Sequence, residues 1–185
     1  MPYNGAMNAL NPIIVLATIA DYPTIQNMAR FYVYDLSKHC GLTLKDWALP
    51  ADGLYESFDY RIYFEDPTRK AFLIKVNDEI AGFVLLNQIG RLPETLWNMG
   101  EFFILGRFQG KHIGRYVAQQ IWNQHPGLWE VSVIPDNLPA ITFWRSVIND
   151  FTHGLYSETI MSVSHDDHPP NQVIFTFNTD LVTNS

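Results

Sequence analysis

The residues best suited to bind a ligand lie in a short basic turn between an apolar segment and a predicted helix. Residues 99–105 are mostly apolar, and residues 106–122 follow as GRFQGKHIGRYVAQQIW, with Gly110, Lys111 and His112 in the turn. Helix N-termini carry unpaired N–H donors and a partial positive charge, so a glycine-containing turn at such a place suits an anionic ligand. The pattern therefore predicts a binding site for a phosphate-bearing cofactor, such as a pyrophosphate.

The elements around this turn predict a mixed α/β fold built on a largely antiparallel sheet. Apolar residues recur at spacings of three and four after Asp21, which predicts a helix with one core-facing side. Asn77 and Asp78 join two β-rich runs, 71–76 and 79–86, and both residue types tolerate the positive φ of a tight hairpin turn. Further strands are predicted at 13–17, 99–105, 128–134, 156–162 and 172–177, and further helices at 113–125 and 138–148. A short helix among loops is expected between 41 and 69.

Length and composition bound the class of protein. A chain of 185 residues, 47% of them hydrophobic and without a long flexible linker, can bury a sizeable core, so one domain over residues 1–185 is expected. Residues 1–11 are candidates for a flexible extension. The net charge of -7 argues against nucleic acid or an acidic membrane as a partner, because nonspecific phosphate binding needs clustered cations.

Cysteine content and the first residues of the chain indicate the cellular compartment of the protein. The single cysteine, Cys40, excludes an internal disulfide and a cysteine-rich metal cage. The opening MPYNGAMNALNP lacks a basic start followed by a long apolar core, and no apolar run reaches membrane-spanning length. These features predict a cytoplasmic protein.

Two motifs in the second half of the chain resemble the GNAT N-acetyltransferases. That family has an Arg/Gln-x-x-Gly-x-Gly/Ala turn after its fourth strand, and residues 109–114 stand at that place here. The family's Asn-x-x-Ala-x-x-Phe-Tyr pattern is similar to Asn137, Ala140, Phe143 and Trp144. Order and separation agree along the whole chain, which also resembles a subgroup of uncharacterised predicted acetyltransferases. The resemblance implies a central, mostly antiparallel sheet of about six to seven strands flanked by helices, with strands 4 and 5 splayed apart.

The same resemblance implies a set of residues that bind acetyl-CoA. Main-chain groups along one strand edge would meet the pantetheine arm, the turn would hold the pyrophosphate with charge from Lys111 and Arg115, and Asn137 would contact the cofactor. Asn137 can equally be only a helix N-cap. The residues implied for the pantetheine are Phe103, Ile104 and Leu105, and those for the pyrophosphate are Gln109, Gly110, Lys111, His112, Ile113, Gly114 and Arg115.

Two positions depart from the family pattern. His112 replaces the middle glycine of the turn, and a residue with a Cβ tolerates a left-handed backbone less well than glycine does. We expect its imidazole to face solvent rather than to act in catalysis. Trp144 stands where many members have a tyrosine that protonates the leaving thiolate. An indole N–H cannot transfer a proton near neutral pH, so Trp144 either stabilises the thiolate or simply packs in the core.

Glu101 is the leading candidate for the base that removes a proton from the substrate ammonium, directly or through water. It opens the strand that leads to the turn, and burial beside Phe102 and Phe103 would raise its pKa into a useful range. A purely structural carboxylate is the alternative.

Other polar residues are weaker candidates for a functional site. Candidates for the lining of the acceptor pocket are Tyr32, Tyr34, Asp35, Asp52, Tyr55 and Tyr60. His165, Asp166, Asp167 and His168 resemble a metal cluster, but they lie between two predicted strands and a solvated loop is the preferred interpretation. No metal is expected.

The resemblance implies acetyl transfer from acetyl-CoA to an amine, a small molecule or a peptide, by direct attack through a tetrahedral intermediate and without a covalent acyl-enzyme. His112 and Trp144 together leave open a noncatalytic acyl-CoA-binding or sensing module. A structural domain that has lost CoA binding is a third alternative. The sequence does not fix the acceptor, and it is compatible with a homodimer.

Overall fold

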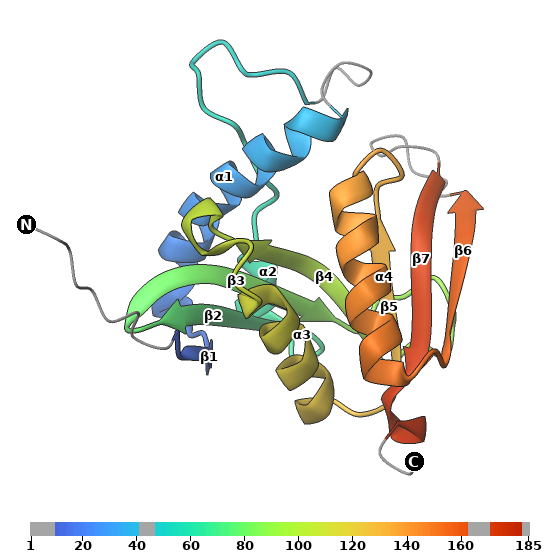
Figure 1. Cartoon of the computed structure of the whole chain (residues 1–185). Coiled ribbons are helices and arrows are strands. Elements are labelled where there is room, and N and C mark those ends of the chain that lie inside the picture. Colours follow the sequence, from blue (N-terminus) through green and yellow to red (C-terminus); the bar gives the residue numbers. More distant parts are fainter. Residues whose placement is uncertain (1–9, 41–46, 163–170, 183–185) are drawn as a thin grey trace, which may run out of the picture.

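The computed structural model describes residues 10–40, 47–162 and 171–182. Its strands form one seven-stranded sheet in the order β1-β2-β3-β4-β5-β7-β6 (Figure 1). Neighbouring strands are antiparallel except for the parallel pair β4 and β5. The strands are β1 (Pro12–Leu16), β2 (Lys70–Val76), β3 (Glu79–Asn87), β4 (Trp97–Ile104), β5 (Leu128–Val133), β6 (Tyr156–Ser162) and β7 (Asn171–Asn178).

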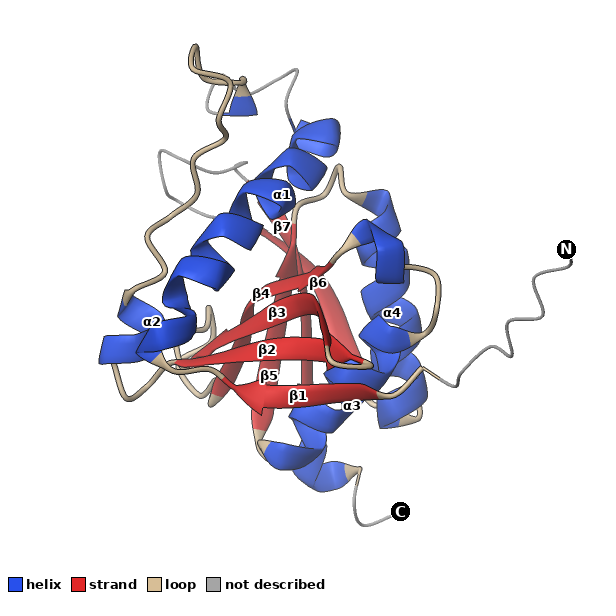
Figure 2. Cartoon of the chain, turned by 90° about the vertical axis from the view of Figure 1, so that its left-hand side faces the viewer, coloured by secondary structure: helices blue, strands red, loops and turns tan. Residues whose placement is uncertain are grey.

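In the described ranges, four α-helices cover the two faces of the sheet. Figure 2 shows α1 and α2 on one side and α3 and α4 on the other. Their bounds are α1 (Tyr22–Cys40), α2 (Ile62–Glu65), α3 (Ile113–Gln124) and α4 (Leu138–Thr152). The predicted fold class, a helix-flanked and mostly antiparallel sheet, is confirmed.

Alternation along the strands builds one core on each face. On β2, Phe72 and Ile74 pack into a large core under α3 and α4, which we call the α3/α4 core. Ala71 and Leu73 point the other way, into a smaller core that contains Ile25 of α1, which we call the α1/α2 core. Successive side chains of a strand point to opposite faces, so each strand residue belongs to one core only.

The β2–β3 hairpin closes as the sequence predicts. Asn77 and Asp78 have φ values of 50° and 68°, and they form the two-residue loop between Val76 and Glu79. Positive φ at both loop positions gives a turn whose twist matches that of the flanking strands.

The sheet opens between its two parallel strands. β4 and β5 pair only through Trp97 with Trp129 and Asn98 with Glu130, and beyond these pairs they diverge (Figure 1). β4 continues along β3, whereas β5 continues along β7. The splay predicted between the fourth and fifth strands is therefore present.

A bulge in β4 changes which residues face the opening. Leu85 lies opposite Glu101 but Leu86 lies opposite Met99, so Gly100 is an additional residue in β4. A Cβ at Gly100 would lie 2.6 Å from the Tyr63 hydroxyl, which explains why a glycine is needed there. Bulges re-aim the side chains that follow them, and this one places Glu101 on the α1/α2 side of the sheet.

Candidate active site

The turn after β4 holds two residues in the left-handed region. Gly110 has φ of 70° and His112 has φ of 61°, and α3 begins at the next residue, Ile113. A Cβ at Gly110 would meet nothing within 4 Å, so its glycine serves the backbone conformation and not a close approach. His112 adopts a left-handed conformation that glycine tolerates better, and its side chain is exposed.

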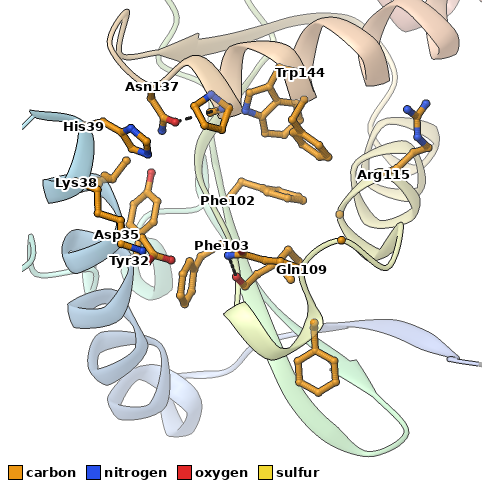
Figure 3. A pocket seen from close by; sticks show the side chains of 18 of the residues that line it. Tyr32, Asp35, Lys38, His39, Phe102, Phe103, Gln109, Arg115, Asn137 and Trp144 are labelled. Atoms are coloured by element: carbon orange, nitrogen blue, oxygen red, sulfur yellow. Dashed lines mark hydrogen bonds and ion pairs between the residues drawn. The ribbon is translucent and has the colours of Figure 1, made fainter.

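This turn borders a cavity of about 600 Å³, which we call the turn cavity (Figure 3). Its lining comes from the C-terminal half of α1, the end of β4, the turn itself and the start of α4. The first N–H groups of a helix have no partner within it, so the N-terminus of α3 offers unpaired donors at this place. The lining residues are Tyr32, Asp35, Leu36, Lys38, His39, Phe102, Phe103, Ile104, Phe108, Gln109, Gly110, His112, Gly114, Arg115, Asn137, Pro139, Ala140, Phe143 and Trp144.

Gly114 lies where the first turn of α3 meets α4. A Cβ at Gly114 would lie 3.2 Å from Cζ of Phe143 and 3.6 Å from Cε1 of Phe102. Glycine thus allows a close approach between the helix start and the aromatic wall of the turn cavity. A larger side chain would have to project into that cavity or displace the wall.

Main-chain groups at the end of β4 are divided between the sheet and the opening. The Leu105 N–H donates to the Ala81 carbonyl at 2.8 Å, so it belongs to the ladder with β3. Alternate residues of an antiparallel pair direct their main-chain groups away from the partner, so those of Phe102 and Ile104 face the opening. Those of Phe103 and Leu105, two of the three residues expected to meet the pantetheine, face β3 instead. The Ile104 carbonyl accepts a 2.8 Å bond from Nε2 of Gln109, which ties the turn to the strand (Figure 3).

The cations of the turn are placed differently from one another. The guanidinium of Arg115 pairs with Asp150 of α4 and donates to Oγ of Ser146 at 2.8 Å, and Figure 3 shows it pointing away from the cavity. Lys111 is exposed and is not among the lining residues of the turn cavity. Ile113 is buried in the α3/α4 core. The main chain of the turn, more than its charged side chains, therefore faces the cavity.

Asn137 and Trp144 bring α4 to the turn cavity. Oδ1 of Asn137 accepts from the Ala140 N–H at 3.2 Å, so the residue is the N-cap of α4 as well as part of the lining. Trp144 is buried and packs edge-on against Phe102, with ring centroids 5.0 Å apart. Its indole thus has a packing role, and it also reaches the cavity wall (Figure 3).

Glu101 lies on the α1/α2 side of the sheet and does not line the turn cavity itself. Burial raises the pKa of its carboxyl to about 7, while hydrogen bonds from Tyr32 and Tyr60 oppose that rise. Tyr32 comes from α1, and burial with the neighbouring carboxylate raises the pKa of its phenol well above the ordinary value. A carboxylate with such a pKa exchanges protons near neutral pH, and the two phenols stay protonated as donors.

A second cavity, of about 400 Å³, surrounds Glu101, and we call it the Glu101 cavity. Tyr32 and Leu36 line both cavities, so the two adjoin along α1. Its lining residues are Tyr32, Val33, Leu36, Trp47, Phe58, Tyr60, Asn87, Ile89, Gly90, Arg91, Asn98, Met99, Gly100, Glu101, Glu130, Ser132, Ile134 and Gln172.

Of the six residues predicted for the acceptor pocket, Tyr32 and Tyr60 line the Glu101 cavity, and Asp35 lines the turn cavity. Tyr34, Asp52 and Tyr55 line neither. The suggested metal cluster at residues 165–168 lies outside the described residues. Within the ranges that the structure describes, no three His, Cys, Asp or Glu side chains are arranged to hold a metal ion. No helix in the described ranges is long and apolar enough to cross a membrane.

Sequence reasoning missed several polar residues of the Glu101 cavity. Asn98, Glu130 and Gln172 come from β4, β5 and β7, and all three line it. Glu130 is fully buried and accepts from the N–H groups of Arg91 and Leu92 at 2.9 and 3.2 Å. A charged residue inside a strand of apolar neighbours is a signal that could have indicated Glu130, whereas nothing local marks the other two.

Comparison with known proteins identifies the family. Residues 32–147 match the acetyltransferase (GNAT) family, and the chain belongs to it. Members of this family typically use acetyl-CoA. No curated protein is significantly similar in sequence to this chain.

Solved structures of N-acetyltransferases share the fold. A spermidine N-acetyltransferase chimera from Vibrio cholerae is 15% identical, with a TM-score of 0.62 over 94% of this chain and 99% of that one. An acetyltransferase from Thermus thermophilus is 16% identical, with a TM-score of 0.62 over 93% and 99% of the two chains. The ribosomal-protein-S18-alanine N-acetyltransferase from Escherichia coli is 13% identical, with a TM-score of 0.57 over 91% and 94%.

Proposed function

We propose that this protein transfers the acetyl group of acetyl-CoA to a primary amine by direct attack. The observation that carries the proposal is the position of Glu101, a carboxyl with a pKa of about 7 on a cavity that adjoins the turn cavity at Tyr32 and Leu36. Such a transfer needs a base close to an activated thioester.

The residues of the turn cavity suit acetyl-CoA. The unpaired N–H groups at the start of α3 would hold the pyrophosphate, in a turn whose shape depends on Gly110 and His112. Main-chain groups of Phe102 and Ile104 face the opening and would bond the pantetheine arm as an additional strand does. When bound, acetyl-CoA supplies an acyl group that is already activated.

Glu101 would take the proton that the acceptor nitrogen releases as its bond to the acyl carbon forms and the carbon–sulfur bond breaks. The Tyr32 and Tyr60 hydroxyls, which lower the pKa of the carboxyl against the effect of burial, would help to hold the carboxylate in place. Trp144 cannot return a proton to the thiolate, so its indole would only donate a hydrogen bond or pack. A cytoplasmic location and a homodimeric state stay predictions.

The proposal is tested by incubating the purified protein with acetyl-CoA and a panel of primary amines while following free thiol. We expect thiol release that depends on the acceptor and rises as pH increases through about 7, where Glu101 loses its proton.

The competing function is a noncatalytic acyl-CoA-binding module, favoured by the absence of a proton donor at Trp144. Tight CoA binding without thiol release across the panel would select it. Failure to bind CoA would contradict both functions.

A further inference from the structure

The proposed reaction leaves a proton on Glu101 and a thiolate in the turn cavity. Trp144, on the wall of that cavity, cannot supply a proton to the thiolate, because an indole N–H does not ionise near neutral pH. Glu101 lines the Glu101 cavity and not the turn cavity, which disfavours a direct transfer from its carboxyl to the sulfur. A side chain that reaches both cavities is therefore needed to complete the reaction.

Tyr32 lies between the two cavities. Tyr32 and Leu36 line both of them, and of these two residues only Tyr32 carries an ionisable group. Its hydroxyl lies close enough to Glu101 to lower the pKa of that carboxyl. Figure 3 shows the Tyr32 ring projecting from α1 into the turn cavity with its oxygen at the tip. The phenol thus has the carboxyl as one neighbour and the turn cavity as another.

Packing holds the Tyr32 ring beside β4. The ring contacts Phe83 of β3 edge-on, with centroids 6.1 Å apart, and its centroid lies 5.7 Å from that of Phe103 of β4. Both phenylalanines are buried, so the tyrosine has little room to change its rotamer. Phe103 adjoins Phe102, whose main-chain groups face the opening in the sheet. Tyr32 therefore stands next to the part of β4 along which the pantetheine arm is proposed to lie.

Other proton donors of the turn cavity lie further from the carboxyl. Lys38 and His39 are near the end of α1, six and seven residues after Tyr32, which is roughly 10 Å along the helix axis. His112 is exposed at the turn. None of the three lines the Glu101 cavity. Among the described lining residues, Tyr32 is thus the ionisable group that the two cavities share.

We propose that the Tyr32 hydroxyl gives its proton to the thiolate that leaves the acyl carbon and takes the proton of Glu101 in return. Starting from a neutral amine, the nitrogen lone pair forms the new bond to carbon, and the electrons of the carbon–sulfur bond leave on sulfur. The proton that the nitrogen loses passes to Glu101, then to the phenol oxygen as the phenol proton passes to sulfur. This inference rests on the proposed function and assigns the acid that Trp144 cannot provide.

The acidities of the three groups favour this direction. An ordinary thiol has a pKa of about 8.5, whereas the pKa of Glu101 is about 7, so a proton moves downhill from the carboxyl to a thiolate. Burial and the nearby Glu101 raise the pKa of Tyr32 well above its ordinary value. The phenol alone is therefore a weak acid, and it passes a proton on only as it receives one from Glu101.

The first test measures contact between Tyr32 and the sulfur without turnover. CoA is bound to the protein, and ionisation of its thiol is followed by thiolate absorbance against the complex with desulfo-CoA, which lacks the sulfur. A phenol that donates to the thiolate stabilises it, so Tyr32→Phe should raise the pKa of the bound thiol by about 1. Tyr60→Phe is the matched control, because Tyr60 also lowers the pKa of Glu101 but does not line the turn cavity. It should leave the pKa of the thiol within about 0.3 of the wild-type value.

The second test follows thiol release from acetyl-CoA with an amine that the wild-type protein acetylates. Tyr32→Phe should lower turnover by about a hundredfold, the scale of a general acid, while CoA affinity stays within about twofold. An equal loss in Tyr60→Phe would assign the effect to the position of Glu101 and overturn the inference. An unchanged pKa of the bound thiol in Tyr32→Phe would also overturn it. A raised thiol pKa in His39→Gln alone would move the donor to the end of α1 and refute the role of Tyr32.

The two tests separate this inference from the proposed function. Wild-type thiol release that Tyr32→Phe does not slow keeps the transferase and refutes the relay. No release with any amine refutes the transferase, and the pKa of the bound thiol then still decides whether the Tyr32 hydroxyl meets the sulfur.

Discussion

The turn cavity and the Glu101 cavity adjoin along α1, yet they are built in different ways. Between its walls from α1 and α4, the turn cavity is lined by a contiguous piece of chain within residues 102–114, and the main chain of this piece is proposed to hold the cofactor. The Glu101 cavity is assembled from side chains on α1, β4, β5 and β7. A site made from backbone leaves a compact sequence pattern, and a site made from dispersed side chains leaves none.

The comparison also indicates which of the two cavities can accept substitutions. The turn is held by the conformational needs of Gly110 and by the close contact of Gly114 with Phe143, so few substitutions are tolerated there. On the Glu101 side, a changed side chain alters what the cavity recognises without disturbing the turn. The following predictions test that separation, beginning with the largest expected effect.

Gly114→Trp should abolish CoA binding. The indole would have to occupy the turn cavity, because even a Cβ at this position lies 3.2 Å from the Phe143 ring. Calorimetry with CoA measures the loss. Gly106→Trp is the control, since a Cβ there meets nothing within 4 Å and the residue does not line the cavity. Unchanged CoA affinity in Gly114→Trp would show that the turn cavity is not the cofactor site.

Glu101→Gln should lower turnover by about a hundredfold or more while leaving CoA affinity within about twofold, since general bases contribute on that scale. The wild-type rate should rise with pH to a plateau above about 7, and the variant should lose this rise. Steady-state rates between pH 5.5 and 8.5 provide the measurement, with Glu65→Gln on the exposed surface of α2 as control. An equal pH profile in the variant would remove Glu101 from the mechanism.

Glu101→Gln should lower turnover, but it should raise the free energy of unfolding relative to wild type at neutral pH. The pKa of Glu101 is raised from 4.5 to about 7 in the folded protein, so the folded state holds its proton more tightly than the unfolded state does. Its contribution is therefore fully present below pH 4.5 and is lost as pH rises through about 7.

Urea unfolding should show Glu101→Gln gaining about 2 kcal/mol relative to wild type between pH 5 and pH 8, a value reduced from the full shift because the group is partly accessible. A constant difference between the two proteins across this range would contradict the assigned burial.

His112→Gly should produce the smallest change. Glycine relieves a left-handed residue at φ of 61°, which should raise the unfolding free energy by about 0.5–1 kcal/mol. CoA affinity should stay within about threefold, because the imidazole is exposed at the turn and the proposed contacts there come from the main chain. Asn77→Gly, at φ of 50° in the distant β2–β3 hairpin, is the matched control for the stability gain. A large loss of CoA affinity in His112→Gly alone would assign the imidazole to the pyrophosphate.

Local patterns were sufficient to predict most of the elements. The two-residue loop at Asn77 and Asp78, the helix after Asp21 and the strand before the turn all follow from propensity and periodicity. The helix predicted at 138–148 extends to Thr152, where His153 at φ of 52° ends it. Helix ends are hard to place because a stop through a non-glycine residue gives little signal.

For the candidate site, the sequence was sufficient to predict the position of the turn and the raised pKa of Glu101. Burial raises the pKa of Glu101, as the sequence predicts, and the role of Glu101 as a base stays a prediction. The role of charge in the turn was harder to predict, because whether Arg115 faces a ligand or pairs with Asp150 depends on where α4 packs.

By itself, then, this sequence determined the elements, the family and the backbone-built turn, because each of these depends on neighbours within a few residues. Only the tertiary structure decided the rest. The Gly100 bulge turns Glu101 to the α1/α2 side of the sheet, and α1 brings Tyr32 to it. The strand order brings Asn98 of β4 and Gln172 of β7 to the lining of one cavity. Contacts between residues so far apart in the chain arise from sheet register and helix packing, which no local pattern encodes.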